Sequence, residues 1–214
     1  MLFIKKVFVI ALCITCFIRC TGGSQQNGHN KTIDITFKQG EKLRTKDWVC
    51  YNLSDSRICI PSNWKFEQQS KYYFFSELDG PYDVNSFFVI AKYDKLSSGL
   101  GAIKYLKETF NQLKRDTVEK FMGYTVKKLI FNDKVSYYCE YFTSVGNKPY
   151  IGYSTIFEQD GNLFDITLKT DSIRSEKYRE RYRDVLFNIY RKNEPVFSAK
   201  DNIKDVKVID ITKL

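Results

Sequence analysis

The sequence predicts a single α+β domain in which strands outnumber helices. Apolar and polar residues alternate in most segments between residues 47 and 169, as in half-buried strands. The apolar spacing changes to three and four residues only in two segments, which indicates two amphipathic helices. Hydrophobic residues make up 43% of the 214 residues, enough for a packed core that needs neither disulfides nor metals. This length fits one domain with a leader and tails.

Residues 1–19 have the pattern of an export signal. Lys5 and Lys6 form a positively charged start, and the apolar run at 7–18 is shorter than the roughly 20 residues of a spanning helix. Cys20 then opens a polar tether over residues 20–42. This layout resembles that of bacterial lipoproteins, and the resemblance implies that Cys20 carries a diacyl anchor. Arg19 stands where that family has a small residue, so plain secretion and an uncleaved anchor remain as alternatives.

Three cysteines lie in the body of the chain. A turn at residues 54–56 would join strands at 47–53 and 57–60 into a hairpin and place Cys50 opposite Cys59. Outside the cytoplasm such a pair can persist as a disulfide, although buried free thiols are the alternative. Cys139 is left over and is expected to be buried.

The helices and the remaining strands follow from periodicity. A helix of about five turns is expected from residue 98, and a second helix is expected over 175–191. Residues 61–64 are expected to form a turn, and the polar segment 192–214 is expected to be a loosely attached tail. The remaining strands are expected at residues 72–75, 85–93, 123–131, 135–144, 150–158 and 163–169.

The order of these elements resembles the PsbP-like superfamily. The resemblance rests on that order, on the corner from Pro61 to Trp64 and on the hairpin at Asp160 and Gly161. It implies an α/β/α sandwich over residues 43–191, with a curved antiparallel sheet of about six strands flanked by helices. It also implies a binding or scaffolding role without a shared active site, and a buried Trp64.

Little catalytic chemistry is visible in the predicted domain. His29, the single histidine, lies in the tether, so histidine-dependent triads and zinc sites are not expected in the domain. Glu140, Glu158 and Asp165 are expected to be exposed carboxylates on a sheet, although two of them held a few ångströms apart could cleave a glycoside. No catalytic residue, metal or cofactor is predicted.

Two features indicate binding. Arg174, Lys177 and Arg181 crowd the second helix and form a candidate patch for an anionic partner, although a solvated helix face is the alternative. The net charge is +9, and about +6 remains when the three cations of the leader are subtracted. The aromatic run at 72–75, with Phe87 and Phe88, is assigned to the core, with a sugar- or protein-binding surface as the alternative. Nucleic acid is not expected as a partner of an exported protein.

The resulting hypothesis is a non-enzymatic lipoprotein of the cell envelope, anchored in the membrane and facing the periplasm rather than the cell surface. It would act as an accessory or scaffold subunit that binds a partner protein. The alternatives are a secreted or periplasmic protein that binds a small ligand or glycan, and a hydrolase with a carboxylate pair.

Overall fold

A computed structural model describes residues 47–53, 56–69, 72–77, 87–94, 99, 101–131, 134–197 and 203–211. The predicted signal at 1–19, the tether at 20–42 and the lipidation site Cys20 lie outside these residues.

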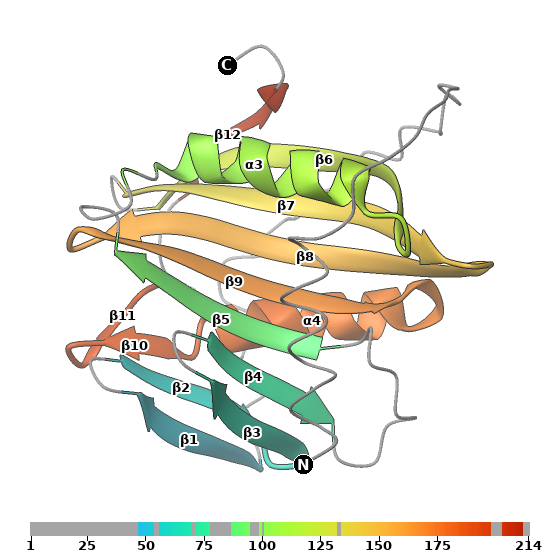
Figure 1. Ribbon diagram of the computed structural model, residues 1–214. Coiled ribbons are helices and arrows are strands. Elements are labelled where there is room, and N and C mark those ends of the chain that lie inside the picture. Colours follow the sequence, from blue (N-terminus) through green and yellow to red (C-terminus); the bar gives the residue numbers. More distant parts are fainter. Residues whose placement is uncertain are drawn as a thin grey trace.

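Most of the described chain belongs to one large antiparallel sheet (Figure 1). Its eight strands run in the order β12-β6-β7-β8-β9-β5-β4-β3. They are β3 (Trp64–Gln69), β4 (Tyr72–Glu77), β5 (Phe87–Asp94), β6 (Lys120–Phe131), β7 (Lys134–Val145), β8 (Lys148–Gln159), β9 (Asn162–Asp171) and β12 (Ile203–Ile209).

A second, four-stranded sheet has the order β1-β2-β10-β11. Its strands are β1 (Trp48–Leu53), β2 (Ser56–Pro61), β10 (Ile189–Arg191) and β11 (Glu194–Pro195). The described strands therefore exceed the expected six, although the expected helices on both sides of a sheet are present.

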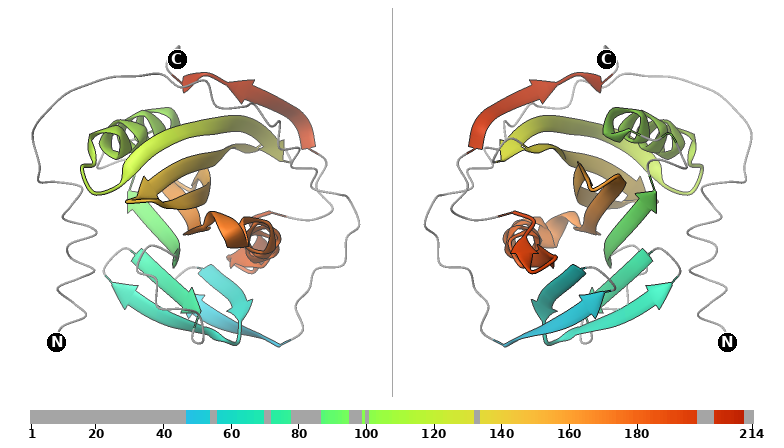
Figure 2. Two further views of the ribbon diagram at one scale, coloured as in Figure 1. Left: turned by 90° about the vertical axis from the view of Figure 1, so that its right-hand side faces the viewer. Right: turned by 90° about the vertical axis from the view of Figure 1, so that its left-hand side faces the viewer.

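The two helices cover opposite faces of the large sheet. Helix α3 (Ala102–Arg115) packs on one face through Leu106 and Phe110, which are almost fully buried. Helix α4 (Ser175–Leu186) follows the short 3-10 turn η1 (Ser172–Arg174) and packs on the other face. Figure 2 shows that the large sheet curves around α4. Because strand side chains alternate between faces, this arrangement gives the protein two cores, one on each side of the large sheet.

Strand β3 was not among the predicted strands, and it begins at the last residue of the turn expected at residues 61–64. The turn is limited to Ser62 and Asn63, and Trp64 and Phe66 then alternate with polar residues along the strand. Trp64 is buried, as expected, and its ring packs beside those of Phe88 and Tyr178. The short alternation was too brief to be distinguished from a loop by sequence alone.

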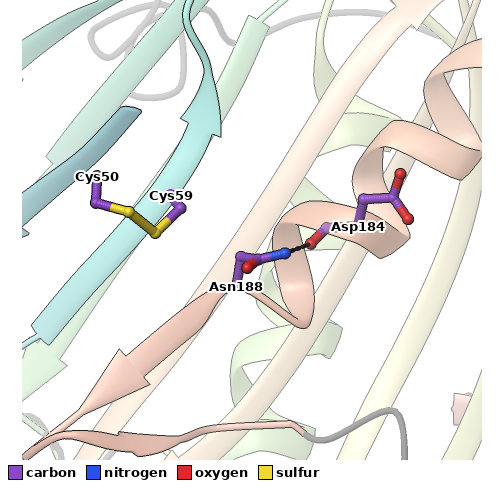
Figure 3. Close-up of a disulfide and its surroundings, with 4 residues drawn as sticks. All are labelled: Cys50, Cys59, Asp184 and Asn188. Carbon is purple, nitrogen blue, oxygen red and sulfur yellow. Dashed lines mark hydrogen bonds between the residues drawn. A yellow bond between two sulfur atoms is a disulfide. The ribbon is translucent and has the colours of Figure 1, made fainter. Parts of the chain in front are cut away.

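The second helix ends at Leu186, five residues earlier than predicted. Asn188 closes it, because its side-chain amide donates a hydrogen bond of 2.8 Å to the backbone carbonyl of Asp184 (Figure 3). The Asn188 carbonyl in turn accepts from the Cys59 backbone N–H at 3.0 Å. Residues 189–191 therefore leave the helix and pair with β2.

The segment after residue 191 is not the loosely attached tail that was expected. Val196 and Phe197 are buried in the core on the α4 side. Strand β12 pairs with β6, and Ile211 is buried on the α3 side. The weak apolar alternation in this segment is sufficient for a strand to form, because β12 can pair with the backbone groups at the edge of β6.

Candidate functional site

The predicted basic patch lies on and just before α4, and its cations contact neighbouring side chains. Arg174 forms an ion pair with Asp171 at 2.7 Å. Arg174 and Lys177 both lie over the Tyr178 ring, at 5.3 and 5.7 Å from its centroid. Arg181 lies 5.8 Å from the centroid of the Trp48 ring. These contacts fix the positions of the cations but also engage part of their charge.

The cysteines of the first hairpin form a disulfide. Cys50 and Cys59 are direct partners in the β1–β2 register, and their sulfur atoms are bonded (Figure 3). Cys139 is free and buried. Burial, and to a smaller extent the nearby Asp165 carboxylate, raise the pKa of the Cys139 thiol well above its usual value. A thiol in this state is a poor nucleophile.

Asp165 is buried beneath α3, in contrast to the exposed position that was expected. Its carboxylate accepts hydrogen bonds from the hydroxyls of Tyr105 at 2.6 Å, Ser154 at 2.8 Å and Thr167 at 2.7 Å. Burial raises the pKa of Asp165, and the three hydrogen bonds offset part of this effect. The alternation of side chains along β9 was predicted correctly, but α3 covers the face of the sheet that carries Asp165.

Glu140 is also buried rather than exposed, and it lies on the opposite face of the sheet. It accepts a hydrogen bond of 2.8 Å from the Tyr138 hydroxyl and lies 3.8 Å from the Arg179 guanidinium. Burial raises its pKa, while Tyr138 and Arg179 lower it in part. Glu140 and Asp165 therefore do not form the facing pair that glycoside cleavage requires.

Glu158 lies in a different environment from Asp165 and Glu140, at the N-terminus of α3. Its carboxylate accepts the backbone N–H of Ala102 at 2.8 Å and so caps the first turn of α3. The cap complements the partial positive charge of a helix N-terminus.

The aromatic run contributes mainly to the core. Phe75 and Phe88 are almost fully buried, and their rings lie 5.6 Å apart at the centroids. Tyr72, Tyr73 and Phe74 remain half-buried.

The cavity between the two sheets is small. Its walls are mainly apolar, and it has room for about one water molecule. Its lining includes Ile58, Ile90, Phe164 and Ile189. An enclosed pocket for a drug-sized ligand is therefore not formed between the sheets.

One end of the large sheet exposes three apolar side chains. Ile173 is 94% exposed, Val118 is 65% exposed and Met122 is 62% exposed. The strand register aligns the start of β6, the end of β7, the start of β8 and the end of β9 in one row. Val118 lies just before β6, Met122 lies near its start and Ile173 follows β9, so all three share this end. We call these three residues the apolar end.

The loops of the apolar end are held by aspartates. The Asp116 carboxylate accepts the backbone N–H groups of Val118 at 2.8 Å and Glu119 at 2.9 Å. The Asp171 carboxylate accepts the Arg174 backbone N–H at 3.0 Å and its side-chain Nε at 2.7 Å. Both loops therefore hold an apolar residue outward in a fixed position.

A further ion pair connects this end across the sheet. Glu119, before β6, contacts Lys169 on β9, and the Lys169 ammonium lies 5.3 Å from the centroid of the Tyr150 ring.

The pKa of Asp171 lies below its usual value. Burial raises this pKa, but the hydrogen bonds and the charge of Arg174 outweigh the effect of burial. The aspartate that orders η1 is thus ionised at neutral pH.

Sequence reasoning did not find the apolar end. Val118 and Ile173 are single apolar residues in polar surroundings, and isolated surface apolar residues are common. Only the strand register brings them to one end. The available signal was weak: each apolar residue follows an aspartate by two residues in a segment without periodicity.

Comparison with solved structures identifies a PsbP-like fold. The cyanobacterial PsbP (CyanoP) from Synechocystis superimposes with a TM-score of 0.51 over 68% of this chain and 92% of its own, at 13% identity. LpqN, involved in cell envelope biogenesis of Mycobacterium tuberculosis, gives a TM-score of 0.43 over 66% of this chain and 88% of its own, at 11% identity. A protein of Bacteroides thetaiotaomicron gives 0.40 over 69% of this chain and 48% of its own, at 14% identity.

The sequence comparisons add no relative. No family model matches the chain, and neither does any curated protein. In the part of the chain that the structure describes, no helix has the length and apolarity to cross a membrane. The same residues contain no group of three or more histidine, cysteine or acidic side chains placed to hold a metal ion.

Proposed function

We propose that this protein is a non-enzymatic accessory or scaffold protein of the cell envelope that binds a partner protein through its apolar end. The observation that carries the proposal is the fixed outward placement of Val118, Met122 and Ile173. Apolar side chains exposed to this degree gain the most free energy when a partner removes them from water. Because their loops are already ordered, binding loses little conformational entropy.

The surroundings of the apolar end indicate the chemistry of the partner. Lys120 and Lys148 are exposed beside it, and the half-buried Arg174 lies next to Ile173. Asp171 neutralises part of the Arg174 charge. A partner surface that offers an apolar pocket with acidic groups around it would complement this end.

The shape of this end favours a protein over a flat lipid surface. The β7–β8 hairpin projects beyond the neighbouring loops, and its tip contains exposed Asn147 and Lys148 (Figure 1). Val118 and Ile173 belong to loops on either side of it, and the strands next to these loops, β6 and β9, are three strand spacings or about 14 Å apart. A bilayer would meet the polar hairpin first, whereas a protein surface can provide a recess for it.

The positions of the carboxylates support a proposal without an enzymatic role. Asp165 and Glu140 are enclosed on opposite faces of the sheet, and Glu158 caps a helix. Each has an internal structural role that accounts for its position.

Photo-crosslinking tests the partner. A photoreactive residue is placed at Val118, Met122 or Ile173 of the full chain in its native cells, with Val208 as the control. Val208 is 61% exposed but lies on β12, away from the apolar end. We expect one protein adduct of the same identity from all three positions and none from Val208. The purified partner should bind the full chain, and Ile173→Asp should weaken binding by about tenfold or more.

Two outcomes contradict the proposal. Adducts of lipid alone would make the apolar end a membrane contact. Adducts that are equally frequent at Val208 would show that exposure, not a docking surface, determines the crosslinks.

The membrane anchor is a separate part of the proposal. Intact mass of the protein recovered from native membranes should begin at Cys20 with added acyl chains, and Cys20→Ala should remove them. An unmodified, soluble wild-type chain would overturn the anchor without affecting the docking surface.

A further inference from the structure

A second surface feature lies at the opposite end of the large sheet. There the first turn of α3 and the start of β7 border an open groove of about 900 Å³. Its walls carry four lysines: Lys104 and Lys107 from α3, Lys128 from β6 and Lys134 from β7. The other lining residues are Gly101, Ala102, Ile103, Val135, Tyr137 and Glu158. We call this feature the lysine groove.

The lining of the lysine groove is strongly positive. Four lysines and one glutamate give a formal charge of +4 − 1 = +3. Glu158 is held by its hydrogen bond to the Ala102 N–H at the helix terminus. Among the described residues, no ion pair engages Lys104 or Lys128. The lining of the groove therefore carries more positive than negative formal charge.

The positive charge extends onto the neighbouring strand. Lys207 of β12 is the direct register partner of Lys128 on β6, so both side chains project from the same face of the sheet. Like charges placed directly opposite each other on a sheet destabilise the pair. An anion bound between these ammonium groups would remove this repulsion, so the folded protein gains from binding one.

We propose that the lysine groove binds a phosphate-bearing ligand. The lining contains lysines and no arginine, and a lysine ammonium binds phosphate as a compact point charge with three donors. The phosphate can belong to a soluble phosphate ester or to a lipid headgroup, which share this chemistry. The inference does not depend on the partner at the apolar end.

Lys128→Glu is the informative variant. It removes a groove lysine and at the same time turns the unfavourable pair with Lys207 into an attractive one, so the fold is expected to be retained or slightly stabilised. A loss of binding then cannot be attributed to unfolding. Lys114→Glu is the matched control, because it makes the same charge change at an exposed position in the last turn of α3, outside the groove lining.

The first arm of the experiment uses inorganic pyrophosphate. The full chain is titrated by calorimetry at about 150 mM salt, where exposed charges more than about 8 Å apart are largely screened. We expect saturable binding that Lys128→Glu weakens by about tenfold or more and that Lys114→Glu leaves within about twofold. Non-saturable binding, or equal losses in both variants, would show general charge attraction and overturn the site.

The second arm identifies the source of the phosphate. Vesicles of phosphatidylglycerol are compared with vesicles of phosphatidylcholine in a flotation assay with the same variants. Flotation with phosphatidylglycerol that depends on Lys128 assigns the groove to a lipid headgroup. Pyrophosphate binding without Lys128-dependent flotation assigns it to a soluble ester.

Discussion

Removal of the Cys50–Cys59 disulfide should lower stability by an amount that the structure allows us to estimate. The two cysteines are nine residues apart in sequence. In the chain-entropy treatment, closing a loop of this length reduces the entropy of the unfolded chain by about 2.1 + 1.5R ln 9 cal/mol/K, or about 2.6 kcal/mol at 25 °C. The effect should reach the whole domain, because Ile58 and Ile60 of the same hairpin are fully buried in the core on the α4 side.

Urea unfolding of the double variant Cys50→Ala/Cys59→Ala measures this loss. We expect the free energy of unfolding to fall by about 2–3 kcal/mol with an unchanged slope. Reductant should destabilise the wild type by a similar amount and leave the double variant unaffected, since Cys139 is already a free thiol. A loss below about 0.5 kcal/mol would refute the reasoning, because it would mean that the hairpin unfolds independently of the core.

Three further predictions concern the large sheet. Gly152→Ala should lower the free energy of unfolding in urea by at least about 2 kcal/mol, because a Cβ there would lie 2.0 Å from the Tyr141 ring. Gly101→Ala is the control that should be tolerated, because its Cβ would meet nothing closer than 3.6 Å. Asp165→Asn should be more stable than Asp165→Ala, since the amide oxygen still accepts buried hydroxyl donors at about 1–3 kcal/mol each; equal stabilities would contradict this account. The raised pKa of Asp165 means that the folded state binds the Asp165 proton more tightly than the unfolded state does. The stability of the wild type relative to Asp165→Asn should therefore fall as pH rises from about 4 through the folded pKa. A stability difference that does not change with pH would contradict the raised pKa.

The Asp171 carboxylate should show the opposite pH dependence. Its pKa is depressed by Arg174, so its contribution is present above the unfolded value of about 4 and is lost as pH falls through the folded pKa. Proteolysis of the η1 loop should accelerate below about pH 4 in the wild type. Asp171→Asn should give the faster cleavage already at neutral pH, and a wild-type cleavage rate independent of pH would argue against the clamp.

Local patterns were sufficient for the long elements of the fold. The strands around Cys139 and Tyr153 are strongly periodic, and their bounds were predicted to within two residues. The helix containing Leu106 and Phe110 was also predicted, but it begins at Ala102 rather than at residue 98. The opposition of Cys50 and Cys59 followed from the hairpin turn between them. Short elements were less visible: Trp64 and Phe66 begin a strand that six residues could not distinguish from a loop.

The burial of Asp165 could not be predicted from its own strand. An alternating strand looks the same whether its polar face meets water or a helix. Tyr105, which donates to Asp165, lies 60 residues away in sequence, and only the packing of α3 on β9 brings the two together. The candidate sites depend on such placement too, since Val118 and Ile173 share an end, and Lys128 faces Lys207, only through strand register.

The sequence by itself determined the α+β class, the two amphipathic helices and the disulfide-compatible hairpin, because these properties depend on local periodicity and composition. The tertiary structure alone decided how many strands join, which carboxylates are buried, and which exposed residues gather at the two ends of the sheet. Those outcomes depend on contacts between residues far apart in the chain, for which local sequence carries no signal.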